Sequence, residues 1–197
     1  MLKLIISLGN PGEKLALSRH NFGFMTLDKL AQNHEQRFIF DKKFNALINQ
    51  IKFGDRNIIL AKPQTMMNNS GQAAAKISRY WQIKPEEILV VHDDNDIPFG
   101  QIKLVFNRNS AGHRGVDSII DHLKTQAFFR LRLGILPETP SELSLEDFVL
   151  QPFGQTEQTE ISPIIKKTGQ IIWSAIEWTG RNPEDLLKLN LISQDTE

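Results

Sequence analysis

Three short apolar runs constrain the fold of this 197-residue chain more than any other feature of its sequence. Residues 2–8 and 88–92 are almost continuously apolar, as in strands that are covered on both faces of a sheet. Residues 129–135 alternate arginine with leucine, the pattern of a strand with one exposed face. Apolar residues within 20–34 recur instead at helical spacing. This alternation predicts an α/β fold: a single three-layer domain with a mixed, mostly parallel sheet and helices on both faces.

The remaining segments fit the same pattern. Gly54-Asp55 marks the turn of a hairpin, and Asp93 to Asp96 follow an apolar run as an acidic turn. Ser18 is positioned to cap one helix, and Asn69 or Ser70 to cap the next. The predicted strands are 2–8, 44–53, 57–62, 88–92, 101–106 and 129–135, and the predicted helices are 20–34, 70–81, 116–123, 145–150, 162–178 and 183–189.

Composition excludes several classes of protein. With 40% hydrophobic and 23% charged residues, the chain is globular, and we expect one domain over residues 1–197. It has no cysteine, which excludes disulfides, thiolate metal sites and cysteine nucleophiles. The first apolar run is too short for a signal peptide, and no run reaches the roughly 20 apolar residues of a membrane span. We therefore expect a cytoplasmic protein without a membrane partner.

Charge is distributed unevenly along a chain whose formal net charge is zero. Residues 101–132 contain six basic and two acidic residues, whereas residues 137–160 contain six acidic residues and no Lys or Arg. Such asymmetry can conceal a phosphate-binding face, although solvated surface charge is the simpler explanation. Residues 136–160 are also rich in Pro, Glu, Gln and Thr, and we interpret them as a mobile connection or lid.

The turn Gly9-Asn10-Pro11-Gly12 lies between a predicted strand and a predicted helix, where phosphate-binding loops occur. It lacks the Lys-Ser/Thr of a P-loop and the third glycine of a dinucleotide fingerprint, so neither assignment holds. Proline and glycine explain it as a tight turn. Asn10 is the exception, because a short amide at the end of a strand can also contact a ligand.

His20 and Asp93 are candidates for a catalytic pair. Asp93 follows a strand of the predicted sheet, the edge at which α/β proteins bind their ligands. If the topology brings the two together, the carboxylate would fix the imidazole tautomer and raise its basicity. The chain has no cysteine and no Gly-x-Ser-x-Gly nucleophile elbow, so water is the expected nucleophile.

A metal site is the competing interpretation, built on His92, Asp93, Asp94, Asp96 and His113. Neighbouring strand residues point to opposite faces, so adjacent members of this set would not readily share one ion. The segment also lacks the EF-hand spacing and the His-Glu-x-x-His motif. We expect neither a metal nor another cofactor.

Several motifs follow one another in a fixed order along residues 1–190. They are Leu8-Gly-Asn-Pro-Gly with Arg19-His20-Asn21, Lys62-Pro-Gln-Thr-Met-Met-Asn68, Ile88-Leu-Val-Val-His-Asp93, Gly112-His113, Phe129-Arg-Leu-Arg132 and Asp147-Phe-Val-Leu150. In this order they resemble the motifs of bacterial peptidyl-tRNA hydrolases. The resemblance implies hydrolysis of the ester between a peptide, or an N-blocked aminoacyl group, and tRNA, which frees tRNA from peptides released prematurely by the ribosome. The partner would be peptidyl-tRNA, through its acceptor stem and 3′ end, and the enzyme a monomer.

The resemblance also implies residue roles. His20 would be the general base and Asp93 would hold it in its basic form, while Asn10 would help to distinguish a blocked amino group from a free one. Spacing alone makes Met66 and Met67 core residues, whereas the resemblance implies that they line the cleft. Asn68 and His113 would bind the substrate, and Lys103 and Arg132 match a clamp for tRNA phosphates; Arg108 and Arg130 are clamp candidates from the charge count only.

Two positions depart from the family pattern. Leu15 stands where the family usually has a tyrosine, which removes a hydrogen bond from the substrate wall. Arg114 replaces the asparagine of the usual Gly-Gly-His-Asn-Gly, and a guanidinium cannot accept a hydrogen bond. Arg114 could bind the 3′ end or stabilise a developing oxyanion, and its charge would disfavour protonated His20. We expect altered turnover or substrate preference.

Two other functions stay open. A divergent tRNA- or ribosome-associated binding protein could keep this fold and lose catalysis through Leu15 and Arg114. A metal-dependent phosphodiesterase or amidase could use the region from Asp93 to Asp96.

Overall fold

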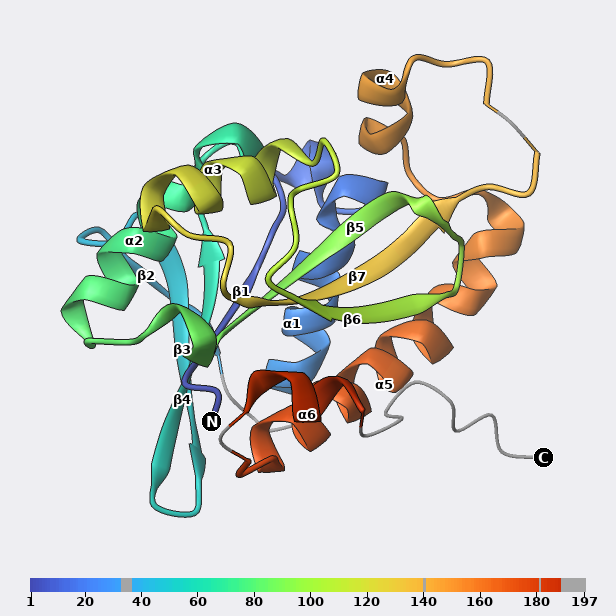
Figure 1. The fold of residues 1–197 in the computed structure, drawn as a ribbon. Coiled ribbons are helices and arrows are strands. Elements are labelled where there is room, and N and C mark those ends of the chain that lie inside the picture. Colours follow the sequence, from blue (N-terminus) through green and yellow to red (C-terminus); the bar gives the residue numbers. More distant parts are fainter. Residues whose placement is uncertain (33–36, 140, 181, 189–197) are drawn as a thin grey trace.

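Seven strands of the computed structural model form one mixed sheet, in the order β2-β3-β4-β1-β5-β7-β6 (Figure 1). The structure describes residues 1–32, 37–139, 141–180 and 182–188. The strands are β1 Leu4–Ser7, β2 Ile39–Asp41, β3 Ala46–Phe53, β4 Arg56–Pro63, β5 Ile88–Pro98, β6 Ile102–Phe106 and β7 Phe129–Leu136.

Parallel pairing dominates the centre of the sheet. β1 pairs in parallel with β4 and β5, and β5 with β7. β3 is antiparallel to both β2 and β4, and β6 is antiparallel to β7. Five of these seven strands, all but β3 and β6, therefore run in the same direction, which confirms the predicted mixed, mostly parallel sheet.

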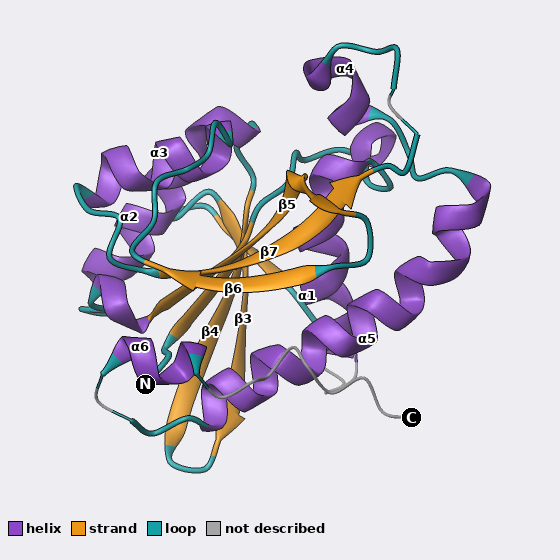
Figure 2. Ribbon diagram, turned by 45° about the vertical axis from the view of Figure 1, so that its right-hand side comes forward, coloured by secondary structure: helices purple, strands orange, loops and turns teal. Residues whose placement is uncertain are grey.

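Helices cover both faces because the central strands are apolar on both sides. Ile5, Leu89 and Val91 face the layer that contains α1 (Phe22–Gln32) and α5 (Gln155–Glu177). The alternate residues Leu4, Ile6 and Val90 pack in a second core with α2 (Ser70–Tyr80) and α3 (Arg114–Leu123). Figure 2 shows the two helical layers on opposite sides of the sheet, as the three-layer prediction requires. Two short helices, α4 (Leu145–Leu150) and α6 (Pro183–Leu187), complete the fold.

None of the helices that the structure describes, the 23-residue α5 included, combines the length and the apolar character needed to cross a bilayer.

The predicted start of the first helix at residue 20 is wrong. A 3-10 turn, Arg19–Asn21, carries His20, and α1 begins only at Phe22. Ser18 lies at the N-cap position of this turn, but its hydroxyl donates to the carbonyl of Leu15 instead of capping the helix. Asn69 likewise precedes α2 without a side-chain cap. Residues 33–34 of the predicted helix lie outside the described residues.

The predicted strand 88–92 is too short, since β5 continues to Pro98. Asp93 and Asp94 pair with Leu133 and Gly134 of β7, and the register shifts only between Asp94 and Pro98. The acidic residues interrupt the apolar pattern but not the ladder, because pairing uses the backbone. Asp93 is therefore held inside the sheet and not in a turn.

Two further elements differ from the sequence prediction. Helix α5 begins at Gln155, seven residues before the predicted start at residue 162, where Glu157 caps it by accepting from the Gly154 amide at 2.6 Å. The predicted connection 136–160 therefore includes α4 and the start of α5. Edge strand β2 was not predicted, because its exposed residues Ile39 and Phe40 show no alternating pattern.

Gly23 allows α1 to start directly against the sheet. A Cβ atom at this position would lie 2.5 Å from the carbonyl oxygen of Val91 and 2.8 Å from that of Leu8. Backbone oxygens at these distances cannot rotate away, so only glycine fits here. This contact holds the turn with His20 beside the end of β5.

We predict that Gly23→Ala destabilises the protein by about 1–3 kcal/mol, because α1 must move away from β5. The control is Gly169→Ala in α5, where a Cβ would meet only Leu30 at an ordinary 3.7 Å and where alanine improves helix propensity. Urea unfolding of both variants measures the effect. Equal stabilities for Gly23→Ala and the parent chain would contradict the close contact.

Candidate active site

A cleft opens where the carboxyl ends of β1, β4 and β5 meet, the edge at which α/β sheets bind ligands. One wall comes from α3 and the segment before α2, and the other from α4. The cleft is lined by Asn10, His20, Met66, Met67, Asn68, Asp93, Asn95, Gly112, His113, Arg114, Leu145, Glu146, Val149 and Leu150.

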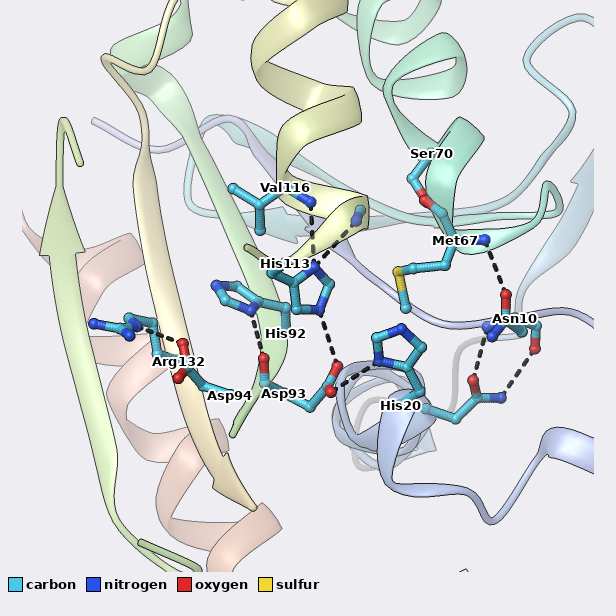
Figure 3. A network of polar contacts seen from close by, with 12 residues as sticks. Asn10, His20, Met67, Ser70, His92, Asp93, Asp94, His113, Val116 and Arg132 are labelled. Carbon is cyan, nitrogen blue, oxygen red and sulfur yellow. Dashed lines mark hydrogen bonds and ion pairs between the residues drawn. The ribbon is translucent and has the colours of Figure 1, made fainter. Parts of the chain in front are cut away.

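His20 and Asp93 meet at the floor of this cleft, as Figure 3 shows. Nδ1 of His20 lies 2.8 Å from Oδ2 of Asp93, whose side chain is 2% exposed. Asp93 lies on β5. Gly23 packs closely against Val91 of the same strand, and this contact holds the turn that carries His20. The two candidates, 73 residues apart in sequence, are brought together by the topology.

His113 is a second histidine on the same carboxylate. Its Nδ1 accepts from the amides of Gly115 and Val116, at 3.1 and 3.3 Å, and so caps α3. A nitrogen that accepts carries no proton, so the proton is on Nε2, which donates to Oδ1 of Asp93 at 3.1 Å. Both oxygens of Asp93 are thereby occupied, and Nε2 of His20 has no partner among the described residues.

These contacts set the charges in the site. Burial lowers the pKa of His20, but the charge and the hydrogen bond of Asp93 together outweigh burial. The pKa of His20 is therefore raised, although the charge of Arg114 lowers it by a smaller amount. Burial would raise the pKa of Asp93, but His20 and His113 reverse this, so the carboxyl stays ionised. Burial, together with His113 and Arg130, lowers the pKa of His92 well below its usual value.

Asn10 is held at three points. Its amide nitrogen donates to Oδ1 of Asn21 at 2.7 Å, and Nδ2 of Asn21 donates back to the Asn10 carbonyl at 3.0 Å. The Met67 amide donates to Oδ1 of Asn10 at 2.9 Å. The Asn10 side chain therefore uses its oxygen for structure, and its NH₂ group has no hydrogen-bond partner among the described residues. Asn21 was missed as a site residue, and only its position beside His20 could have indicated it.

The two methionines differ in their environment. Met67 is 5% exposed and its side chain extends toward His113 in Figure 3. A Cβ at Gly115 would overlap its sulfur, so glycine at the start of α3 makes room for it. Met66 is 55% exposed, and Asn68 is exposed with no hydrogen bond among the described residues. Met66, Met67 and Asn68 all line the cleft.

The two departures from the family pattern have different positions. Leu15 is half-buried in the 3-10 turn Glu13–Leu15 and does not line the cleft. Arg114 is in the cleft wall, where its guanidinium forms an ion pair with Glu146 of α4. Its effect on the pKa of His20 has the sign expected from the sequence, although Asp93 outweighs it.

The predicted phosphate clamp lies outside the cleft. Lys103 and Arg132 are directly opposite each other on β6 and β7, so both side chains are on one face of the sheet. Lys103 is exposed, and Nε of Arg132 donates to Asp94 at 2.6 Å. Arg130 is wrong as a clamp residue: it is 1% exposed and donates to the Asn109 carbonyl, and burial lowers its pKa to about 10.

His20, Asp93 and His113 form a cluster that could hold a metal ion, since their ligand atoms lie within 4.8 Å of one another. An ion would have to displace the two ring protons that these histidines donate to Asp93. The backbone amides of α3 already occupy the other nitrogen of His113. Asp94 does not belong to this cluster, because it binds Arg132 on the other side of β5. The set fits a hydrogen-bonded triad better than a metal centre.

Comparison with known proteins identifies the family. The sequence profile of the family "Peptidyl-tRNA hydrolase" matches residues 4–188. The chain belongs to the peptidyl-tRNA hydrolase family. The peptidyl-tRNA hydrolase of Aquifex aeolicus is 40% identical over 176 residues, which cover 89% of this chain and 91% of that protein. That of a Sulfurihydrogenibium strain is 39% identical over 194 residues, or 98% of this chain and all of that protein.

The fold agrees with solved peptidyl-tRNA hydrolases. The crystal structure of the Acinetobacter baumannii peptidyl-tRNA hydrolase matches with a TM-score of 0.86 and 30% identity, and covers 98% of this chain and 95% of that one. The match thus includes the segment with α4 and α5, where the start of α5 predicted from the sequence differed from the structure. Membership of this hydrolase family agrees with the resemblance seen in the sequence motifs.

We predict that nitrogen NMR of histidine-labelled protein at neutral pH finds the His113 proton on Nε2 and a proton on Nδ1 of His20. His92 is expected to stay neutral on mild acidification, because its ring is fully buried. A His113 ring protonated on Nδ1 would contradict the proposed cap of α3 and the second hydrogen bond to Asp93.

Proposed function

We propose that the chain hydrolyses the ester bond between tRNA and a peptide or N-blocked aminoacyl group, with His20 as general base on water. One observation carries the proposal: ionised Asp93 accepts a hydrogen bond from each of two imidazoles, and Nε2 of His20, in the cleft, has no partner among the described residues. This is the base and its orienting group, without a covalent nucleophile.

The reaction would need only water, His20 and Asp93. Water attacks the ester carbonyl as its proton passes to Nε2 of His20, and Asp93 stabilises the imidazolium that forms. When the tetrahedral intermediate collapses, the same proton passes to the leaving ribose oxygen. A positioned base of this kind contributes about 10²–10⁴-fold to the rate. An ester needs less assistance than an amide, which suits a site without a stronger nucleophile.

Asn10 supports selectivity for a blocked amino group. Its oxygen accepts from Met67, so the NH₂ group is the part of the amide that is free to contact substrate. An NH₂ donor can bind the carbonyl of a peptide or formyl group, but a free α-ammonium offers only donors in return. Asn68 and the two methionines complete the wall on which the acyl group would rest.

Recognition of tRNA would use the basic face on β6 and β7. Lys103 and Arg132 lie side by side there and would contact acceptor-stem phosphates, so binding should weaken as salt rises. The connection 136–160 would act as a lid through α4. In the cell, we propose a cytoplasmic monomer, with no cofactor, that releases tRNA from peptidyl-tRNAs lost prematurely from the ribosome.

We predict that the chain cleaves N-acetylaminoacyl-tRNA but not free aminoacyl-tRNA, that EDTA leaves the rate unchanged, and that His20→Ala abolishes cleavage. The matched control is His122→Ala, an exposed histidine on α3 outside the cleft, which should retain the rate. Release of labelled acyl group measures each case. Binding of tRNA without cleavage would support a binding protein instead, and inhibition by EDTA a metal-dependent hydrolase.

The pH profile tests the roles of His20 and Asp93. The unprotonated ring is the base, so kcat/KM should rise with pH through the raised pKa of His20. In Asp93→Asn the charge that raises this pKa is gone, so the midpoint should move to lower pH. The plateau should fall by about 10²–10⁴-fold, since the amide cannot stabilise imidazolium. A midpoint that stays in place or moves upward would refute the assigned roles.

A further inference from the structure

An ion pair joins the two walls of the cleft and has no role in the hydrolysis described above. It links Arg114, the first residue of α3, to Glu146 near the start of α4. Both residues line the cleft. Their side chains are 65% and 69% exposed, so the pair lies at the mouth of the cleft and not at its floor.

The opposite end of α4 is fixed beside the base. The Arg19 amide donates to the Gln151 carbonyl at 3.0 Å, and the Arg19 guanidinium lies 4.4 Å from the Phe148 ring and donates to the Pro152 carbonyl. Arg19 is the residue directly before His20. Helix α4 is therefore tied to the site at its C-terminal end and meets α3 through Glu146 near its N-terminal end.

The end of α3 at which Arg114 lies attracts anions. A helix N-terminus is the positive end of the helix dipole, and the guanidinium adds a full charge there. A guanidinium binds carboxylate and phosphate through the same pair of N–H groups. Glu146 thus occupies a position on Arg114 that a phosphodiester oxygen would also fit. Exposed ion pairs are weak, so a phosphate can displace the carboxylate.

We propose that Arg114 binds a phosphate of the tRNA 3′ end and that Glu146 competes with this phosphate in the free enzyme. The inference rests on the proposed function, which brings the terminal ribose to His20 and its nearest phosphodiester to the cleft mouth. Arg114 is then a residue that selects substrates with a phosphate at this position. Glu146 sets how strongly such substrates bind.

The test compares KM for N-acetylaminoacyl-tRNA with KM for an N-acetylaminoacyl ester of adenosine, which has no phosphate. Glu146→Gln is expected to lower KM for the tRNA substrate about two- to fivefold, because the competing anion is removed. Arg114→Asn should raise it and reduce the slope of log KM against log salt by about 0.7, the value for one phosphate contact. For the adenosine ester, which has no phosphate to contact, Glu146→Gln should not lower KM and Arg114→Asn should not change the salt slope.

The matched control is Glu142→Gln, which removes the same charge from the same segment. Glu142 is exposed and has no ion-pair partner among the described residues, so KM should stay at the parent value.

In an Arg114→Asn background, Glu146→Gln should lose most of its effect, since the two residues act on one phosphate. An equal fall in KM for both substrates in Glu146→Gln would overturn the proposal in favour of a simple steric lid. An unchanged salt slope in Arg114→Asn would overturn it as well.

Binding separates this proposal from the proposed function. If the parent chain cleaves neither substrate, the proposed function fails, but the Kd for deacylated tRNA still tests Arg114. Tighter binding in Glu146→Gln and a lower salt slope in Arg114→Asn would support the phosphate contact. Equal affinities and slopes in the parent and both variants would overturn it.

Discussion

The buried carboxylate of Asp93 is the interaction on which the rest of the site depends. A charge that is 2% exposed is costly unless hydrogen bonds compensate it, and two imidazole N–H groups do so here. Each imidazole is positioned by a different part of the fold: His20 by a turn packed against β5, and His113 by the first turn of α3. Helices on opposite faces of the sheet thus converge on one charge at its edge.

Sequence reasoning predicted much of the fold, because burial on both faces of a strand leaves a continuous apolar run. It failed where structure does not depend on apolar side chains. β5 extends through Asp93 and Asp94 because pairing is a backbone property, and β2 is exposed. Helix α5 starts early because Glu157 caps it within a polar segment.

The site was predictable in part. His20 and Asp93 belong to a chemical pattern that a sequence can contain, although only topology brings them into contact. Two features had no such signal. Asn21 acts through backbone groups of Asn10, and His113 binds Asp93 only because its other nitrogen caps α3. Both depend on three-dimensional placement, not on residue type.

The tie between Arg19 and the end of α4 has a consequence for how the two ends of the cleft respond to substitution. The C-terminal end of α4 is held beside His20 by contacts of Arg19 with the Gln151 and Pro152 carbonyls, whereas its N-terminal end meets α3 through the exposed side chains of Glu146 and Arg114. Substitution of Glu146 or Arg114 would therefore change the mouth of the cleft and leave the contacts of Arg19 in place. An inhibitor that reaches the mouth of the cleft would meet Arg114 and Glu146, whereas one confined to the floor would meet His20, Asp93 and His113.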